Sequence, residues 1–213
     1  MTRDWREWHA EYADPASSLS RRLEEVRIQL AGLLERDSGP VRLLSLCSGD
    51  GRDTIPVVAG AERDVAVTLV ELDEELAAAA VVAAAAAGIA ADVRTADAGA
   101  STVWRDVLPV EVLMLCGVFG NVADADVERT VAAARSMLVP GGTVIWTRGN
   151  RVPDDPTRHA DDPAEWVRRV FTAAGFEEVA FVKPADASYR VGVARLPEPS
   201  REPLPERLFN FVR

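Results

Sequence analysis

Short apolar runs alternate with helix-forming segments along most of this chain, and that alternation limits what the chain can fold into. Each run is five to seven residues long, and most are rich in Val and Leu, which suits a strand buried inside a sheet. Strands that alternate with helices predict a parallel sheet with helices on both faces. The runs are Val41–Cys47, Val65–Glu71, Ala91–Ala96, Val110–Cys116 and Thr143–Thr147.

The segments beside these runs favour helices. They are rich in alanine and long polar side chains, and several end at glycine or proline. Asp124 or Asp126 is available to cap one of them at its N-terminus. The predicted helices cover Gly51–Gly60, Glu74–Gly88, Asp124–Leu138 and Asp162–Ala174.

The last part of the chain breaks the alternation. Two strand-like runs, Phe176–Lys183 and Tyr189–Leu196, are joined only by Pro184–Ser188. A connection this short permits a hairpin, so one of the two runs should be antiparallel to the other strands. The sequence therefore predicts an α/β, doubly wound sheet of seven strands, mostly parallel with an antiparallel last strand.

The apolar spacing over Ser20–Arg36 predicts an amphipathic helix ahead of the sheet. We expect three parts: an N-terminal helical segment or lid over residues 1–38, an α/β domain over 39–196, and a tail over 197–213 that packs on the same domain. The tail ends in an apolar patch, Leu208–Val212, which either covers the core or forms a dimer interface.

Composition and charge narrow the class of protein. With 213 residues, 48% hydrophobic and 27% charged, the chain has enough apolar surface for one folded domain. It contains no run of about 18 uncharged apolar residues, so we expect no membrane span. The formal charge of −10 argues against a nucleic-acid partner. Two histidines and two widely spaced cysteines predict no metal site, and the polar N-terminus predicts a cytoplasmic protein.

The segment LLSLCSGDGRD, Leu43–Asp53, carries the strongest functional signal. An apolar strand runs into small residues, which let the chain turn sharply and let a ligand approach the backbone. The next strand ends at Glu71, 20 residues after Gly51, and Asp97 follows the third strand. In a doubly wound sheet these positions share the edge where ligands bind, and a carboxylate there suits ribose hydroxyls or an adenine amino group.

With these motifs the chain resembles the class I S-adenosylmethionine-dependent methyltransferases over about residues 43–196. The resemblance implies a Rossmann-like fold that binds S-adenosylmethionine and releases S-adenosylhomocysteine. It places Glu71 at the ribose, and Asp97 at the adenine, while the segment after the fourth strand faces donor and acceptor. The implied cofactor-binding residues are Ser45, Cys47, Ser48, Gly49, Asp50, Gly51, Glu71, Leu72, Asp97, Ala98, Cys116, Gly117 and Val118.

Two positions depart from the family pattern. Ser45 stands where the family usually has an acid, and Cys47 stands where it usually has glycine. The resemblance also covers Leu138–Thr143, which matches the turn before the family's fifth strand.

Methyl transfer is an in-line displacement for which positioning is the protein's main task. His9 and Tyr12 lie in an aromatic N-terminal segment, which is either a lid that touches donor or acceptor or a packing element. Asn121 either hydrogen-bonds the acceptor or forms a turn. Arg148 binds an acidic acceptor or is ion-paired. We take His9, Tyr12 and Asn121 as the catalytic candidates.

The leading hypothesis is a methyltransferase for a small-molecule acceptor, active as a monomer or homodimer without nucleic acid or membrane. The first alternative is a non-catalytic binding module on the same fold, suggested by Ser45. The second is a nicotinamide-dependent oxidoreductase. It is disfavoured because Thr54 occupies the place of the third glycine in the dinucleotide-binding pattern.

Overall fold

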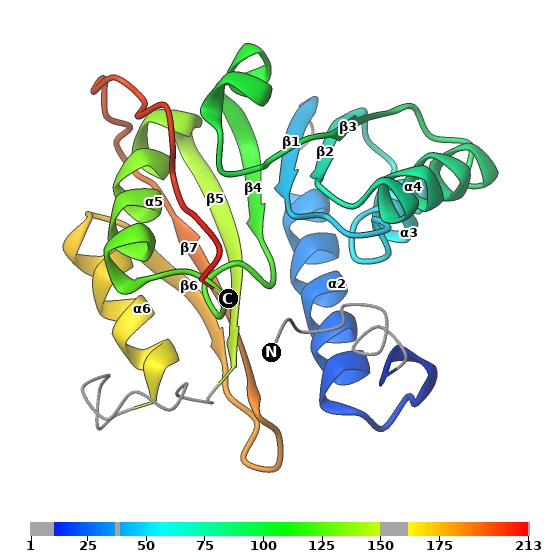
Figure 1. The fold of residues 1–213 in the computed structure, drawn as a ribbon, viewed down its shortest axis with the longest axis horizontal. Helices are drawn as coiled ribbons and strands as arrows, with labels where there is room; N and C mark the ends of the chain where they lie inside the picture. Colours follow the sequence, from blue (N-terminus) through cyan, green and yellow to red (C-terminus); the bar gives the residue numbers. More distant parts are fainter. Residues whose placement is uncertain (1–10, 37–38, 150–161, 213) are drawn as a thin grey trace.

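The computed structural model describes residues 11–36, 39–149 and 162–212, which form one seven-stranded sheet with helices on both faces (Figure 1). The helices are α2 (Ser18–Arg36), α3 (Ile55–Ala59), α4 (Glu74–Ala86), α5 (Asp124–Met137) and α6 (Pro163–Ala173), with short 3₁₀ turns at Glu11–Ala13, Ser101–Val103 and Arg105–Val107. The strands are β1 (Val41–Leu46), β2 (Val65–Glu71), β3 (Ala91–Thr95), β4 (Val110–Leu115), β5 (Leu138–Gly149), β6 (Glu177–Val182) and β7 (Tyr189–Arg195).

The strand order is β3-β2-β1-β4-β5-β7-β6. Strands β1 to β5 pair in parallel, while β7 is antiparallel to both of its neighbours. The predicted seven-stranded, mostly parallel sheet with an antiparallel last strand is therefore confirmed. The order reverses between β1 and β4, and in doubly wound sheets such a reversal is where ligands bind.

The core lies on both faces of the sheet. Alternate residues of a strand point to opposite faces, so Leu44 and Leu46 of β1 join the cluster under α5 and α6, while Leu43 joins the cluster under α2, α3 and α4. Figure 1 shows these two helical layers on either side of the strands. The continuous apolar runs read from the sequence thus correspond to strands buried on both faces.

Two local expectations differ from the structure, and one apolar residue of the amphipathic helix is exposed. The predicted helix over Gly51–Gly60 is shorter, because residues 51–54 form a turn in which the N–H groups of Thr54 and Ile55 donate to Gly51 O. Helix α5 begins without a side-chain cap, since the residue before it is Ala123. Ile28 is 55% exposed, because it lies on the opposite side of α2 from the buried Val26 and Leu30.

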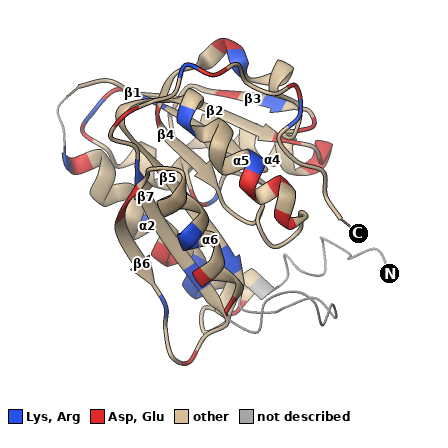
Figure 2. Cartoon of the chain, turned by 90° about the vertical axis from the view of Figure 1, so that its left-hand side faces the viewer, with Lys and Arg blue, Asp and Glu red and all other residues tan. Residues whose placement is uncertain are grey.

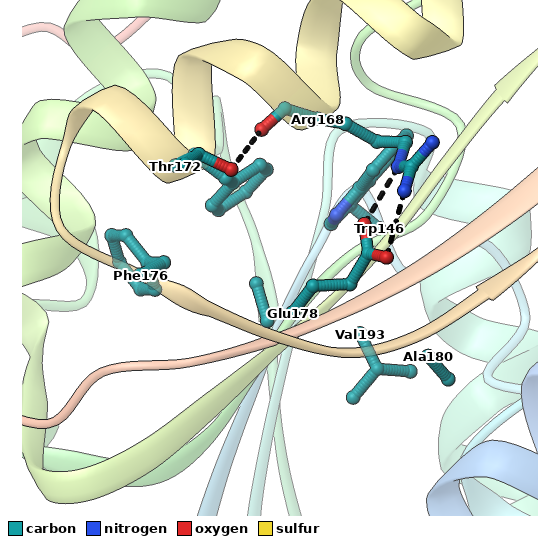
Figure 3. A pocket seen from close by; sticks show the side chains of 9 residues that line it. Trp146, Arg168, Thr172, Phe176, Glu178, Ala180 and Val193 are labelled. Carbon is teal, nitrogen blue, oxygen red and sulfur yellow. Dashed lines mark hydrogen bonds and ion pairs between the residues drawn. The ribbon is translucent and has the colours of Figure 1, made fainter.

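The α6 face of the sheet packs around Trp146, whose ring lies over Gly192 of β7. The ring stacks on Phe171 with centroids 5.7 Å apart. Arg168 of α6 donates two hydrogen bonds to Glu178, at 2.6 and 2.8 Å (Figure 3). The guanidinium of Arg168 also lies over the ring of Phe181, 4.2 Å from its centroid. A Cβ atom on Gly192 would lie only 2.1 Å from Trp146 Cε2, so the glycine makes room for the indole.

Acidic and basic residues are interspersed along the elements visible in Figure 2. Many of them form ion pairs across the surface, such as Arg42 with Glu111 and Arg94 with Asp106. Within the described residues, no helix combines the length and the apolar character needed to cross a membrane.

The packing of Trp146 on Gly192 predicts that Gly192→Ala destabilises the protein. The added methyl group overfills a closed contact, and we expect a loss of about 1–3 kcal/mol in the free energy of unfolding, measured by urea denaturation. The control is Gly32→Ala in α2, where a Cβ meets nothing within 4 Å. That substitution should stabilise the helix by about 0.5–1 kcal/mol. Equal stability of Gly192→Ala and the wild type would contradict the packing.

Candidate functional site

The sequence-predicted cofactor residues gather at one edge of the sheet, where β1 to β4 end. The turn after β1 contains three residues with positive φ: Cys47 at 59°, Gly49 at 57° and Gly51 at 72°. Positive φ is easy for glycine and costly for a residue with a side chain, so Cys47 is held in a strained conformation. Such backbone strain is typical of functional turns.

Glu71 connects the ends of β1 and β2. Its Oε2 accepts a hydrogen bond from Gly49 N at 2.8 Å, while Oε1 accepts from Leu72 N and Asp73 N at 2.9 and 3.0 Å. A carboxylate has about four lone-pair sites, so acceptor capacity remains after these bonds. The backbone therefore fixes the Glu71 carboxylate at the edge, in an orientation that can still accept from a ribose hydroxyl. Leu72 is 61% exposed beside it and offers an apolar surface to a flat ring.

Asp97 follows β3 and is held from two sides. Its Oδ1 accepts from Gly99 N at 2.9 Å, and its Oδ2 accepts from Arg207 of the C-terminal tail at 2.8 Å. The neighbouring Ala98 is buried, and its carbonyl accepts from the indole of the fully buried Trp104 at 2.9 Å. Sequence reasoning found Asp97 but missed Arg207 and Trp104, since neither belongs to a motif near the strand end.

The turn after β4 is closed by hydrogen bonds. Gly117 N donates to the buried Thr147 Oγ1 of β5 at 2.8 Å, and the side chain of Asn121 donates to Gly117 O at 2.7 Å. Asn121 therefore makes the contact expected of a turn-forming residue, which was one of its two predicted roles. Val118 is fully buried beneath the turn. Arg148 is also buried here, with its Nη1 3.2 Å from where a Cβ on Gly120 would lie.

The described part of the N-terminal segment reaches the turn after β1. The guanidinium of Arg52 lies over the ring of Tyr12, 4.1 Å from its centroid, and Arg22 donates to the Tyr12 hydroxyl at 3.2 Å. Arg27 of α2 donates to Arg52 O at 2.9 and 2.7 Å. These contacts place Tyr12 against the candidate donor turn. His9 and the second histidine, His159, lie outside the described residues.

Burial shifts the titration of several groups at this edge. It raises the pKa of the Cys47 thiol, with Glu71 and Asp97 adding to the effect, and it raises the pKa of Cys116 well above its ordinary value. Both thiols are therefore protonated at neutral pH and are poor nucleophiles. Burial also raises the pKa of Tyr12 and of the Asp53 carboxyl, although Arg22 opposes both shifts.

Two serines of the motif have different surroundings. Ser45 lies inside β1, 1% exposed, between Leu69 of β2 and Met114 of β4. Ser48 lies in the turn, 8% exposed, and its hydroxyl has no hydrogen-bond partner within the described residues. A buried hydroxyl without a partner costs about 1–3 kcal/mol, so a polar ligand group at this point would be favourable. The residues at this edge fit an adenosyl ligand, whose ribose hydroxyls and adenine amino group are hydrogen-bond donors.

No protein-family model matches the sequence, and a comparison with curated proteins finds no match. Solved structures do match. The N-methyltransferase NodS from Bradyrhizobium japonicum WM9 has a TM-score of 0.59 at 18% identity, over 82% of this chain and 96% of that one. An RNA methyltransferase from Salinibacter ruber in complex with S-adenosyl-L-homocysteine has a TM-score of 0.52 at 20% identity, over 87% and 97% of the two chains.

The [4+2]-cyclase SpnF is similar as well, with a TM-score of 0.64 at 18% identity, over 87% of this chain and 85% of that one. The chain therefore has the fold of the class I S-adenosylmethionine-dependent methyltransferases. Because the neighbours include a cyclase and share little sequence, the likeness establishes the fold alone. Activity has to be argued from the residues at the strand ends.

The positive φ of Cys47 predicts an unusual ranking of substitutions. In most positions alanine is more favourable than glycine, but in this conformation we expect Cys47→Gly to be more stable than Cys47→Ala by about 1 kcal/mol. Urea denaturation of both variants measures the difference, and comparing them with each other removes the effect of the lost thiol. A more stable alanine variant would mean that residue 47 has an ordinary backbone conformation.

The raised pKa of Asp53 predicts a pH-dependent effect of Asp53→Asn. The folded protein holds the Asp53 proton more tightly than the unfolded chain, so the wild type loses stability as pH rises from the ordinary value of 3.8 through the folded pKa. The variant lacks this loss, and its stability relative to the wild type should increase over that interval and then level off.

Urea denaturation of the two proteins between about pH 3.5 and 7.5 measures the effect of Asp53→Asn. The exposed Asp64→Asn corrects for the removal of one negative charge. A stability difference that stays constant with pH argues against a raised Asp53 pKa.

Proposed function

We propose that this chain transfers the methyl group of S-adenosylmethionine to a small-molecule acceptor. The observation that supports the proposal most is the Glu71 carboxylate, fixed by Gly49 N across the strained turn after β1. The turn adjoins the strand-order reversal between β1 and β4 and contains the unpartnered Ser48 hydroxyl. Glu71 ends the next strand, β2, and Asp97 follows β3 beyond it, at the same edge of the sheet. A small-residue turn followed by an acid at the end of the next strand suits a ligand with a ribose.

In this proposal the chain's own residues bind and orient the donor. Glu71 accepts from a ribose hydroxyl, Asp97 accepts from the adenine amino group, and Leu72 contacts the face of the base. Gly49 and Gly51 allow the ligand to approach the backbone, and Tyr12 covers the turn. The donor supplies an activated sulfonium methyl group, so the chain contributes mainly by positioning and by exclusion of water.

The acceptor would meet the turn after β4 and the end of β5. Asn121 is bonded to Gly117 O, so its proposed role is to shape this loop as well as to contact the acceptor. The raised pKa of Tyr12 keeps its hydroxyl protonated at neutral pH, so Tyr12 would donate a hydrogen bond rather than act as a base. His9 remains the proposed base. Arg148, buried beside Gly120, is either ion-paired or a contact for an acidic group of the acceptor. We propose no nucleic-acid partner, in line with the net charge of −10.

A non-catalytic binding module is the second candidate. It is favoured by Ser45, which places a buried hydroxyl in β1 where the family pattern has an acid. A nicotinamide-dependent oxidoreductase is less favoured. Thr54 fills the place of the third glycine and is fully buried, with its hydroxyl bonded to Asp53 and Met114. That glycine normally permits close packing of helix on strand around a pyrophosphate.

The proposal predicts that the wild type binds S-adenosylmethionine and S-adenosylhomocysteine, and that Glu71→Ala weakens both about tenfold or more through loss of charge-assisted hydrogen bonds. Isothermal titration calorimetry measures the affinities, with NAD and NADP as comparison ligands. The control is Glu74→Ala. Glu74 lies at the start of α4, outside the site, so this variant removes the same charge and should bind both ligands like the wild type.

Binding with turnover on an acceptor panel would establish a methyltransferase, and binding without turnover on any acceptor would favour the binding module. A folded wild type that binds neither sulfur ligand, with or without acceptor candidates, would rule the proposal out.

A further inference from the structure

We infer that the C-terminal segment of residues 207–212, hereafter the tail segment, forms one wall of the adenine end of the donor site, with Arg207 as the positioning residue for Asp97. The inference rests on the proposed function, since it concerns how the same donor is recognised. The tail segment would thus belong to the donor site, although it lies far from the strand-end motifs in the sequence.

The tail segment lies against the loop that follows β3. Leu208 N donates to Gly99 O at 2.8 Å, and Ser101 N donates to Glu206 O at 2.9 Å, with a β-bridge between Ala100 and Arg207. Gly99 has no room for a side chain, because a Cβ there would lie 2.4 Å from Phe209 O. The contact between the tail segment and this loop is therefore close and specific.

The same segment also lies against the loop that follows β4. Val212 N donates to Asn121 O at 2.8 Å, and Phe211 forms a bridge with Val122. Asn210 N donates to Asp126 of α5 at 2.9 Å. In Figure 1 the red tail runs along α5 and ends beside the loop after β4. The tail segment thus joins the loops after β3 and β4.

Buried residues anchor the tail segment while its end remains accessible. Leu208 and Phe209 are fully buried, and the Leu208 carbonyl accepts from Arg129 at 3.2 Å. Phe211 packs edge-on against Phe209, with centroids 5.7 Å apart, yet is 38% exposed. An anchored segment with an exposed aromatic ring can contact a bound base without a large loss of conformational entropy.

The bond between Arg207 and Asp97 serves orientation more than stability. The two side chains are 43% and 44% exposed, and an ion pair this open to water contributes little to folding. Arg207 and Gly99 N together use one site on each Asp97 oxygen, which leaves acceptor capacity on a carboxylate of fixed direction. A fixed carboxylate can distinguish an amino group from a carbonyl at the edge of a purine ring.

The test compares S-adenosylhomocysteine with S-inosylhomocysteine, in which a carbonyl replaces the adenine amino group. The wild type should prefer the adenosyl ligand about tenfold, the worth of one hydrogen bond to a charged acceptor. In Arg207→Ala the affinity for the adenosyl ligand should fall about five- to tenfold and the preference should disappear, while the inosyl ligand binds as before. Arg207→Lys should restore most of the preference.

Two further variants keep the inference open to refutation. Arg201→Ala removes an exposed arginine from the same tail and should bind both ligands like the wild type. A chain ending at Phe209 keeps the buried anchor but lacks Asn210–Val212, the accessible end of the tail segment. It should bind both ligands more weakly, because that part of the wall is gone. Thermal melts establish that each variant is folded.

An equal loss of affinity for both ligands in Arg207→Ala, or no loss for either, would overturn the role of Arg207. Unchanged binding by the chain ending at Phe209 would overturn the wall. If the folded wild type binds neither ligand, the proposed function fails first and the inference with it.

Discussion

The reversal of strand order between β1 and β4 is the constraint on which the candidate site depends. Parallel strands deliver their carboxyl ends to one edge, and connections on the two sides of the reversal leave in opposite directions. The loops therefore separate at this point instead of packing on one another. Glu71 can reach Gly49 only because β1 and β2 are neighbours in register, with Leu46 beside Val70. The pairing of the parallel strands therefore determines where Glu71 and Asp97 lie, and the side-chain contacts only orient them.

Much of this arrangement could be predicted from the sequence because its signals are local. A strand buried on both faces is a short continuous apolar run, a turn of small residues has a recognisable composition, and Glu71 and Asp97 lie at or just after strand ends. The hairpin of β6 and β7 was predictable from the length of its connection. These features depend on neighbours within a few residues.

What could not be predicted depends on contacts between distant parts of the chain. Arg207 and Asp97 are 110 residues apart, and an ion pair at that separation leaves no spacing pattern in one sequence. Thr54, the residue before α3, is also fully buried with its hydroxyl against Met114 of β4, a contact between residues 60 apart in the sequence. Tertiary contacts therefore determine both the partner of the second acid and the burial of the residue before α3.

The contact between Trp146 and Gly192 has a consequence for how such a sequence can change. The two positions face each other across β5 and β7 and share one volume, so the size of one side chain limits the other. A smaller residue at 146 would open space that a side chain at 192 could fill, and the indole can persist only while residue 192 has no side chain. Substitutions at positions 146 and 192 should therefore be accepted in pairs. Strands β5 and β7 are thus expected to change together in evolution, in addition to being joined by hydrogen bonds.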